Sequence, residues 1–452
     1  MVVLLVTALI VCCAVALSIV ERQSLVSLAF IAPFLAVIVL RTAALANVAT
    51  MPAPSSRLHW HNGIPRARTT PEVLPTYAVL VALYDEAHVV PGLVEALGAL
   101  DYPADRLAIR FVVEADDEAT YRALASFALP ACMGVIVVPD GKPRTKPRAL
   151  NYALTQTPGA IVVVYDAEDQ PEPDQLRRAL AAFRASPDTV CQQAALNVTN
   201  YSQSWLSRQF AIEYSALFDV LLPTYRRLGL PMPLGGTSNH FRREALEAVL
   251  AWDPHNVTED ADLGIRLARF GMKVGVFSST TWEEAPATFA VWLRQRTRWL
   301  KGWMTTWLVH MRRPSRLIRE IGVWPFAGFQ LMLASMILSA LVHPWFYVYV
   351  GADVVRHGGF GPFLDGGLNW LDWLALINLV GGYVSAMVLG AVAVVRRGRP
   401  GIAWAVLLMP IYWLCISLAA YRALIQLVRA PHHWEKTPHL ARPARGQPDS
   451  GR

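Results

Sequence analysis

The stretch that decides the fold is Tyr77–Leu83, YAVLVAL, an unbroken apolar run in the middle of more polar sequence. Such a run is typical of a strand that is buried on both faces of a parallel sheet. The pattern recurs at residues 106–113, 135–138 and 161–165, with helices expected at 84–100, 116–129 and 149–154. This alternation predicts right-handed βαβ units, and therefore an α/β, Rossmann-like domain with a mostly parallel sheet.

Acidic residues follow three of these expected strands. They are Asp85 and Glu86 after the first, Glu114 and Asp116 after the second, and Asp166 and Glu168 after the fourth. Ligands of open α/β sheets bind outside the carboxyl ends of the strands. We therefore expect the functional site along this edge.

Residues 166–169 (DAED) directly follow the strand expected at 161–165. Alternate carboxylates on a turn can hold a hard divalent cation, which would neutralise a diphosphate leaving group. The alternative is an acidic loop that caps the helix expected near Pro173. Lys146 stands where a basic loop meets a helix, so it is suited to pair with phosphate. Taken alone, the loop that carries Lys142, Arg144, Lys146 and Arg148 is better explained as a solvated basic segment.

Two further segments offer polar groups that can bind a ligand. Residues 233–241 (PLGGTSNHF) combine two glycines with hydroxyl, amide and imidazole groups, either to bind hydroxyls or to form a turn before a helix at Arg243. Thr258, Glu259 and Asp260 precede an amphipathic helix. Thr258 can be its N-cap and the acids can serve its dipole, but a carboxylate held there can also act as a general base.

Residues 295–303 (QRTRWLKGW) lie on a helix expected at 290–310, just before a long apolar stretch. Gln295, Arg298 and Trp299 share one face of that helix with Gly302 and Trp303. Its tryptophans suit an aromatic belt at a lipid interface. An indole can also stack on a sugar ring, and an Arg one turn away can clamp pyrophosphate. An interfacial helix is able to do both.

Composition points to a membrane, because 54% of the residues are apolar and only 17% are charged. The apolar runs are residues 1–20, 25–48, 323–350, 371–395 and 402–428, each near the roughly 20 residues that a bilayer core requires. The first two predict a helical hairpin; a signal peptide is the alternative, but a basic n-region is missing. Basic residues on both sides of the central domain place it in the cytoplasm by the positive-inside bias.

Three crossings after the central domain would leave a basic tail outside the cell. We therefore expect one of these three segments to be a partial or interfacial helix, interrupted at Pro344 or Pro410. The net charge of +7 collects next to apolar segments, which favours contacts with membrane lipids over nucleic acid. The five cysteines form no pattern of a metal site or a disulfide framework.

Over residues 77–311 the chain resembles the membrane-embedded, processive family-2 glycosyltransferases, which include cellulose, chitin, hyaluronan and curdlan synthases. Its likeness is greatest to bacterial exopolysaccharide synthases of the cellulose-synthase-like branch. The resemblance implies a cytoplasmic GT-A domain, Mg²⁺ or Mn²⁺, a UDP-sugar donor and a growing polysaccharide acceptor at the bacterial inner membrane. Periplasmic or regulatory partner subunits are also consistent with it.

The resemblance also assigns roles to single residues. Tyr84 and Glu86 would hold the uracil, Glu114 and Asp116 would contact the base, Lys146 would bind the diphosphate, and Asp166 and Glu168 would bind the metal and diphosphate. The family usually has Asp at the second metal position, so either Glu168 or its neighbour Asp169 is left as the ligand. Asp260 would be the general base, with Glu259 beside it in the same motif.

On the acceptor side, Gln295 and Arg298 would face the donor, while Trp299 would stack beneath the acceptor sugar. Cellulose synthases carry a Cys-Gly-Ser segment where this chain has a different one. Here the acceptor segment includes Gly236, Thr237, Ser238 and His240, which leaves the acceptor and the linkage open. Only about twenty residues follow the last apolar run, so we expect no attached regulatory domain.

These observations predict an inverting, processive β-glycosyltransferase that polymerises a UDP-sugar, foremost UDP-glucose, and moves the product across the membrane. Two alternatives remain: transfer of a single sugar to a lipid carrier, and a non-catalytic membrane scaffold. The expected regions are a transmembrane hairpin (1–50), a connector (51–75), a GT-A domain (76–288), interfacial helices (289–322), a C-terminal transmembrane region (323–430) and a polar tail (431–452).

Overall fold

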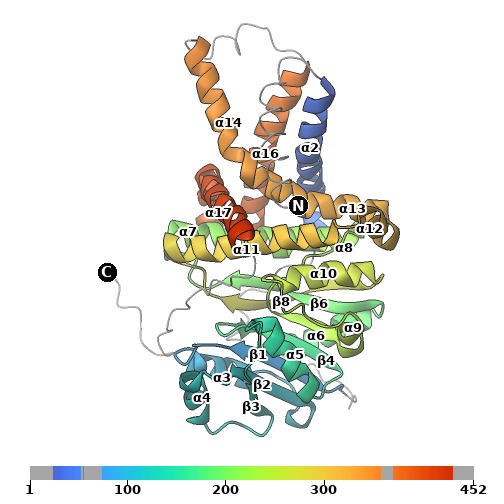
Figure 1. Cartoon of the computed structure of the whole chain (residues 1–452), viewed down its shortest axis with the longest axis vertical. Coiled ribbons are helices and arrows are strands. Elements are labelled where there is room, and N and C mark those ends of the chain that lie inside the picture. The colour runs from blue at the N-terminus through green and yellow to red at the C-terminus, as the bar shows by residue number, and fades with distance from the viewer. Residues whose placement is uncertain (1–23, 52–53, 55–73, 358–369, 431–452) are drawn as a thin grey trace.

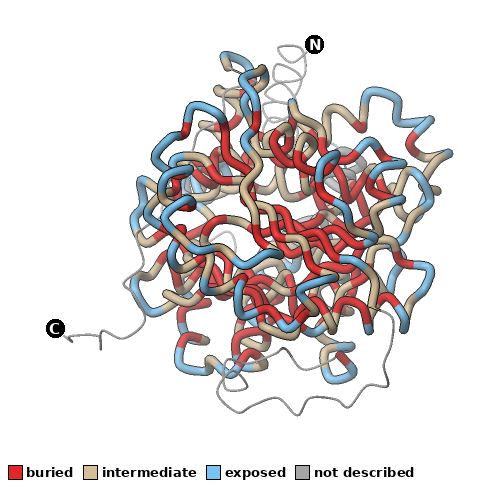
Figure 2. The backbone as a smooth tube through the Cα atoms, turned by 90° about the horizontal axis from the view of Figure 1, so that it is seen from below, coloured by how far each residue is buried: buried red, intermediate tan, exposed pale blue. Residues whose placement is uncertain are grey.

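The computed structural model describes residues 24–51, 54, 74–357 and 370–430. The apolar run expected at 1–20, and with it one half of the predicted hairpin, lies outside the described residues, as does the polar tail. Figure 1 shows a sheet domain, a layer of helices lying across it, and three upright helices on the far side of that layer. Figure 2 shows buried backbone passing through the middle of the molecule.

One eight-stranded sheet forms the centre of the domain, in the order β3-β2-β1-β4-β7-β6-β8-β5. Its strands are β1 (Tyr77–Leu83), β2 (Leu107–Glu114), β3 (Met133–Val138), β4 (Ile161–Tyr165), β5 (Gln170–Pro171), β6 (Thr189–Val198), β7 (Asn239–Arg242) and β8 (Lys273–Glu283). Strands β1 to β4 run parallel, as do β6 and β8, whereas β7 is antiparallel to both of its neighbours. The predicted mostly parallel sheet is thus confirmed.

Two of the four expected strands, Tyr77–Leu83 and Ile161–Tyr165, have the predicted bounds. The other half of the sheet was missed, because polar side chains interrupt its strands. In β6, Gln192, Gln193 and Asn197 are almost fully buried. Their amide nitrogens donate hydrogen bonds inside the domain, as when Gln193 donates to the Thr237 carbonyl at 3.0 Å, so these residues belong to the core.

Helices of the domain cover both faces of the sheet. They are α3 (Val90–Gly98), η3 (Ala104–Arg106), α4 (Glu118–Ala125), α5 (Lys146–Gln156), α6 (Gln175–Ala185), α9 (Arg243–Ala248) and α10 (Glu259–Arg269). The prediction that a helix begins at Tyr84 is wrong. Asp85 has a positive φ of 53° and its N–H donates to the Asp117 carboxylate, so residues 84–89 form a turn instead.

A layer of helices lies between the sheet and the upright helices (Figure 1). It contains α7 (Trp205–Ala216), the π-helical turn η4 (Leu217–Leu221), α8 (Leu222–Arg227), α11 (Phe289–His310) and α12 (Pro314–Ile321). The helix expected at 290–310 is therefore present, one residue longer at its start. In this layer the expected interfacial motif faces the domain on one side and the apolar helices on the other.

Among the residues that the structure describes, four helical segments are long and apolar enough to cross a membrane. The helices concerned are α2 (Ser24–Asn47) with η1 (Val48–Thr50), α13 (Val323–Phe329) continued by η5 (Gln330–Ala334) and α14 (Ser335–His357), α16 (Trp370–Arg396), and η6 (Pro400–Leu408) with α17 (Met409–Arg429). Helices α2, α14 and α16 stand upright, whereas α17 lies lower, beside α11 and α7 (Figure 1).

Helix α17 lies beside α11 and α7, although its composition alone would suit a crossing, and the interfacial segment expected from the basic tail stays a prediction. Of the two predicted break points, Pro344 lies inside α14 and does not end it. Pro410 stands at the start of α17, where the 3₁₀ segment η6 ends. A proline is tolerated in the first turn, because the N–H that it lacks has no helical partner there.

Arginines at the end of α16 join the upright helices to the domain. The Arg397 guanidinium, which is fully buried, forms a bidentate ion pair with Asp219 of η4. Burial raises the pKa of Asp219 although Arg397 opposes this. Arg399 donates to Asn197 of β6 at 2.8 Å. Because an unpaired buried charge is costly, these pairs fix one relative placement of the two parts.

Candidate active site

The centre of the candidate site is the ion pair between Lys146, the first residue of α5, and Asp166, which follows β4. Lys146 Nζ also donates to the Gly236 carbonyl at 3.0 Å. Burial lowers the pKa of this lysine, but the nearby Asp166 and Glu259 carboxylates raise it more, so the ammonium stays charged. Three segments far apart in the sequence therefore meet at one cation.

Asp260 enters the same space from the first turn of α10. Its Oδ2 lies 3.3 Å from the position that a β-carbon on Gly236 would occupy, and Asp166 Oδ2 lies 3.8 Å from that point. Burial, followed by the charge of Glu259, raises the pKa of Asp260 to about 7. An aspartate with such a pKa can take up a proton near neutral pH, as a general base requires.

Glu259 is buried beside Asp260, and burial raises the pKa of Glu259 as well, against the opposing charge of Lys146. The Arg298 guanidinium is close enough to lower the pKa of both carboxyls. Of these charged groups, Asp260, Asp166 and Lys146 lie around Gly236, and Glu259 and Arg298 act on them electrostatically. Because Gly236 has no side chain, space remains between the carboxylates of Asp166 and Asp260.

Helix α11 is fixed directly against the start of α10. A β-carbon on Gly302 would lie 2.3 Å from Thr258 Oγ1, so only a glycine allows this approach. One turn further on, Asn256 donates to Thr306 Oγ1 at 3.0 Å. Thr258 occupies the predicted N-cap position of α10, but its side chain makes no capping hydrogen bond.

Gln295 and Arg298 lie on α11 within this arrangement. Gln295 is nearly buried, and its Oε1 atom has no hydrogen-bond partner in the part of the chain that the structure describes. The same holds for Nε of Arg298. Most buried polar atoms have a hydrogen-bond partner, so these two atoms are available to a group that enters the site. Both side chains are therefore suited to bind a ligand.

Trp299 is half-buried and packs 5.9 Å from Phe210 of α7, measured between ring centroids. The guanidinium of Arg296 lies 4.7 Å from its ring centre and forms a bidentate pair with Glu213, at 2.6 and 2.8 Å. Tyr412 of α17 donates to the same carboxylate at 2.9 Å. This cluster, which joins α7, α11 and α17, was missed because its partners are far apart in the sequence.

The acids expected at the ends of β1 and β2 are close to a second group of cations. Glu114 is buried and pairs with Arg148 at 3.2 Å, while burial raises the pKa of its carboxyl. Asp116 pairs with Arg144, which is also hydrogen-bonded to Tyr84. Leu83 is paired with Val113 in the sheet, so the residues after both strands lie side by side, as expected.

Glu86 is also at this edge, where it is buried and its N–H donates to Thr120 Oγ1 at 2.9 Å. The acidic strand ends thus continue from the Asp166 centre towards Tyr84. Arg144 and Arg148 were read only as a basic loop, yet each pairs with one of the predicted acids. Their alternation with Lys146 was the sequence signal for a common binding surface.

Three residues of the expected acceptor segment are interior residues. Thr237 Oγ1 donates to Asp169 and to the Val164 carbonyl, and Ser238 Oγ donates to Thr281 at 2.5 Å. The ring of His240 bonds Tyr77, and burial lowers its pKa to about 3. These three residues have no exposed surface, and their hydrogen bonds connect strands of the sheet. Gly236 is the residue of this segment that lies beside Asp166 and Asp260.

The metal prediction rests on oxygen ligands near Asp166. No cluster of three His, Cys, Asp or Glu side chains that could hold a metal was found among the described residues. Mg²⁺ and Mn²⁺ sites often need only one or two protein carboxylates, because the nucleotide phosphates supply the rest. Asp166 therefore fits such an ion.

Asp169 is placed differently from Asp166. Its Oδ2 accepts from the Asp166 N–H at 2.7 Å, and burial raises the pKa of its carboxyl, with further contributions from the charges of Asp166, Glu283 and Glu168. Asp169 thus shapes the turn from inside. Of the two candidates for the second ligand, Glu168 is half-buried and Asp169 is almost fully buried.

Comparison with known proteins agrees with this geometry. The model described as "Glycosyltransferase like family 2" matches residues 75–302, which is half of the chain. This range includes β1 to β8, α10 and the first part of α11. It confirms the fold class expected from the alternating strands and helices, a GT-A domain.

Two curated relatives illustrate the activities of similar proteins. One, a beta-monoglucosyldiacylglycerol synthase of Synechocystis sp., is 31% identical over 279 residues, covering 59% of this chain and 57% of the relative. Another, a probable glucomannan 4-beta-mannosyltransferase of Arabidopsis thaliana, is 27% identical over 240 residues. The match covers 51% of this chain and 43% of that relative. The chain thus spans about half the length of the curated relatives it matches.

Among solved structures, a mannosyltransferase from Pyrobaculum calidifontis in complex with GDP-Man and Mn²⁺ is similar. The superposition covers 84% of this chain and 99% of that one, with a TM-score of 0.50 and 18% identity. A likeness at this level concerns the fold.

Proposed function

Because the chain belongs to the glycosyltransferase-like family 2, we propose that it is an inverting, processive β-glycosyltransferase. Its donor would be a UDP-sugar, with UDP-glucose as the first candidate, and its product an exopolysaccharide that the apolar helices conduct across a bacterial inner membrane. The observation that carries this proposal is the meeting of Asp260, Asp166 and Lys146 around Gly236.

In the proposed reaction, Asp260 takes the proton of an acceptor hydroxyl, and the oxygen attacks the anomeric carbon from the side opposite UDP. The bond between that carbon and the diphosphate oxygen breaks, and the configuration inverts. Lys146 and Arg298 stabilise the negative charge that develops on the departing UDP. A divalent ion held by Asp166 would supply further charge neutralisation.

The other site residues would position donor and acceptor. Tyr84, Glu86, Glu114 and Asp116 lie along the strand ends that continue from Asp166, where we propose the uridine binds. Trp299, held by Arg296 and Phe210, would present its ring to the acceptor sugar. Gln295 would bind the donor through its unpartnered amide oxygen.

Transfer of one sugar to a lipid is the second candidate. It is favoured by the likeness to the Synechocystis relative, which is named a beta-monoglucosyldiacylglycerol synthase. The two functions need the same donor chemistry and differ in whether the product is used again as acceptor. The size of the product therefore distinguishes them.

The test uses the full chain in lipid nanodiscs with radiolabelled UDP-glucose, UDP-N-acetylglucosamine or GDP-mannose, each with and without diacylglycerol. Label in a polymer that a linkage-specific hydrolase digests is the expected result. Label found only in chloroform-soluble glycolipid would replace polymerisation by lipid glycosylation. No release of nucleotide from any donor would leave a non-catalytic scaffold.

A further inference from the structure

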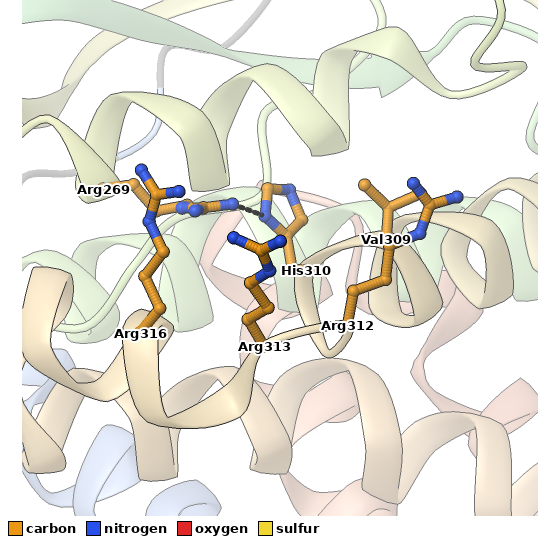
Figure 3. A pocket seen from close by; sticks show the side chains of 6 residues that line it. All are labelled: Arg269, Val309, His310, Arg312, Arg313 and Arg316. Atoms are coloured by element: carbon orange, nitrogen blue, oxygen red, sulfur yellow. Dashed lines mark hydrogen bonds between the residues drawn. The ribbon is translucent and has the colours of Figure 1, made fainter.

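A pocket lies at the opposite end of α10 from Asp260. It has a volume of about 280 Å³ and is lined by Arg269, Val309, His310, Arg312, Arg313 and Arg316. Figure 3 shows these side chains, which come from the end of α10, the end of α11, the turn that follows it and the start of α12. None of them has a part in the proposed sugar transfer.

Positive charge exceeds negative charge around this pocket. Of the four arginines, Arg269 and Arg316 share a single acid, Glu320, each at 2.6 Å. Arg312 and Arg313 are exposed and form no ion pair within the described ranges 24–51, 74–357 and 370–430. The pocket thus carries guanidinium charge that this part of the chain leaves unneutralised.

The inner wall of the pocket is rigid. Arg269 Nη1 donates to His310 Nδ1 at 3.0 Å, and His310 Nε2, on the other side of the ring, donates to Asp262 at 3.0 Å. His310 is only 3% exposed. Because both ring nitrogens are engaged and Glu320 holds Arg269 Nε, the Arg269 guanidinium is fixed before any ligand binds. A fixed guanidinium is well suited to bind phosphate oxygens.

The residues that follow α12 suit a lipid surface near this pocket. Immediately after α12, Val323 and Trp324 are 74% and 59% exposed. The Trp324 indole donates to the Leu228 carbonyl at 2.8 Å, which holds the ring at the start of the apolar segment 323–348. An exposed tryptophan beside a basic cluster is typical of the boundary between headgroups and acyl chains.

We propose that this pocket binds the phosphate of an anionic phospholipid headgroup. The chemistry that it recognises is a phosphate group, and its volume is several times the roughly 30 Å³ that one water occupies. Free phosphate has the same chemistry, but Val323 and Trp324 favour a ligand that also brings acyl chains. The inference goes beyond sugar transfer and does not depend on it.

The experiment measures the melting temperature of the purified full chain in neutral detergent. Short-chain phosphatidylglycerol, short-chain phosphatidylcholine and inorganic phosphate are titrated separately into the wild type and into R312E/R313E. The matched control is R122E/K273E, which makes the same change in net charge at two exposed, ion-paired positions. No sugar donor is present, so the result is independent of the proposed reaction.

We expect phosphatidylglycerol to raise the melting temperature of the wild type and the control at least tenfold more effectively than phosphatidylcholine, with the shift lost in R312E/R313E. Equal shifts in R312E/R313E and the wild type would overturn the proposal. A full shift with inorganic phosphate alone would overturn the lipid assignment. Should the charge reversal prevent folding, R312Q/R313Q takes its place and must lose the same shift.

Discussion

The two ends of α10 carry opposite charges and differ in how deeply the charged side chains are buried. At its start, Glu259 and Asp260 are drawn into the interior, where burial raises the pKa of both. At its end, Arg269 borders an open pocket with three further arginines. A helix dipole favours both arrangements, since acids suit the N-terminus and bases the C-terminus. The dipole therefore does not explain the difference in burial.

The difference lies in what each end must do. The acids at the start are balanced by cations from other elements, Lys146 of α5 and Arg298 of α11, so a small change in surroundings can move a proton. The arginines at the end are permanently charged and have one shared acid, Glu320. One end is suited to proton transfer, and the other to holding an anion.

Removing the carboxylate of Asp260 is expected to give the largest effect. The D260N variant should lose sugar transfer by a factor of about 10² to 10⁴, because the acceptor hydroxyl has no base. Nucleotide affinity, measured by calorimetry, should change little. Burial already disfavours the charged form of Asp260, so the melting temperature at pH 8 should not fall. The control is D188N at an exposed acid, and normal transfer by D260N would refute the assignment of the base.

The contact between α10 and α11 can be broken at Gly302. The G302A variant places a methyl group 2.3 Å from Thr258 Oγ1, so the start of α10 must move relative to α11. We expect a loss of transfer of about tenfold to a hundredfold, since displacements near 1 Å have such effects. In G92A, a helical glycine with no atom within 4 Å of the new methyl, activity should be unchanged. Equal activity of both variants would show that the contact does not matter.

The coupling between the two acids can be tested by the pH dependence of transfer. The pKa of Asp260 is about 7, and only its ionised form can accept a proton, so the rate should rise with pH through 7. In E259Q, one neighbouring negative charge is removed, and the rise should move to lower pH. Because burial is the larger cause of the raised pKa, the pKa of Asp260 in E259Q should remain above the usual range of an aspartate. A rise at unchanged pH would contradict the coupling.

Particular residues show how much the sequence alone could predict. Strands β1 and β4 were placed correctly because apolar runs buried on both faces leave a clear pattern. Strand β6 was missed because Gln193 is a core residue whose amide oxygen accepts from the Gly235 N–H at 2.9 Å. The sequence does not show that a buried amide has hydrogen-bond partners, because those partners come from distant segments.

The candidate site shows the same limit. Asp166 and Asp260 were each found as part of a motif, but their meeting at Gly236 depends on the packing of the whole sheet. The pair of Arg296 and Glu213 joins positions 83 residues apart and has no local signature. His240 was misjudged, because an imidazole beside two glycines resembles a binding group although here it is fully buried.

The smallest effect is expected at the basic end of α10. The hydrogen bond from Arg269, followed by the one from Arg316, lowers the pKa of Glu320, so this acid is ionised at neutral pH and offsets part of the pocket's charge. The E320Q variant should bind short-chain phosphatidylglycerol a few-fold more tightly. Its stability should fall by less than about 1 kcal/mol, as for other surface ion pairs. Sugar transfer in phosphatidylcholine nanodiscs should be unchanged.

The measurement is the lipid concentration that gives half of the melting-temperature shift. The control is E118Q, which removes an exposed acid that pairs with Arg122 in α4, far from the pocket. Higher salt should reduce the gain in E320Q, because it screens charges at the surface. Weaker lipid binding by E320Q would mean that Glu320 matters more for orienting Arg269 than for its charge. In that case the geometry of the guanidinium, and not the excess of positive charge, would determine what the pocket binds.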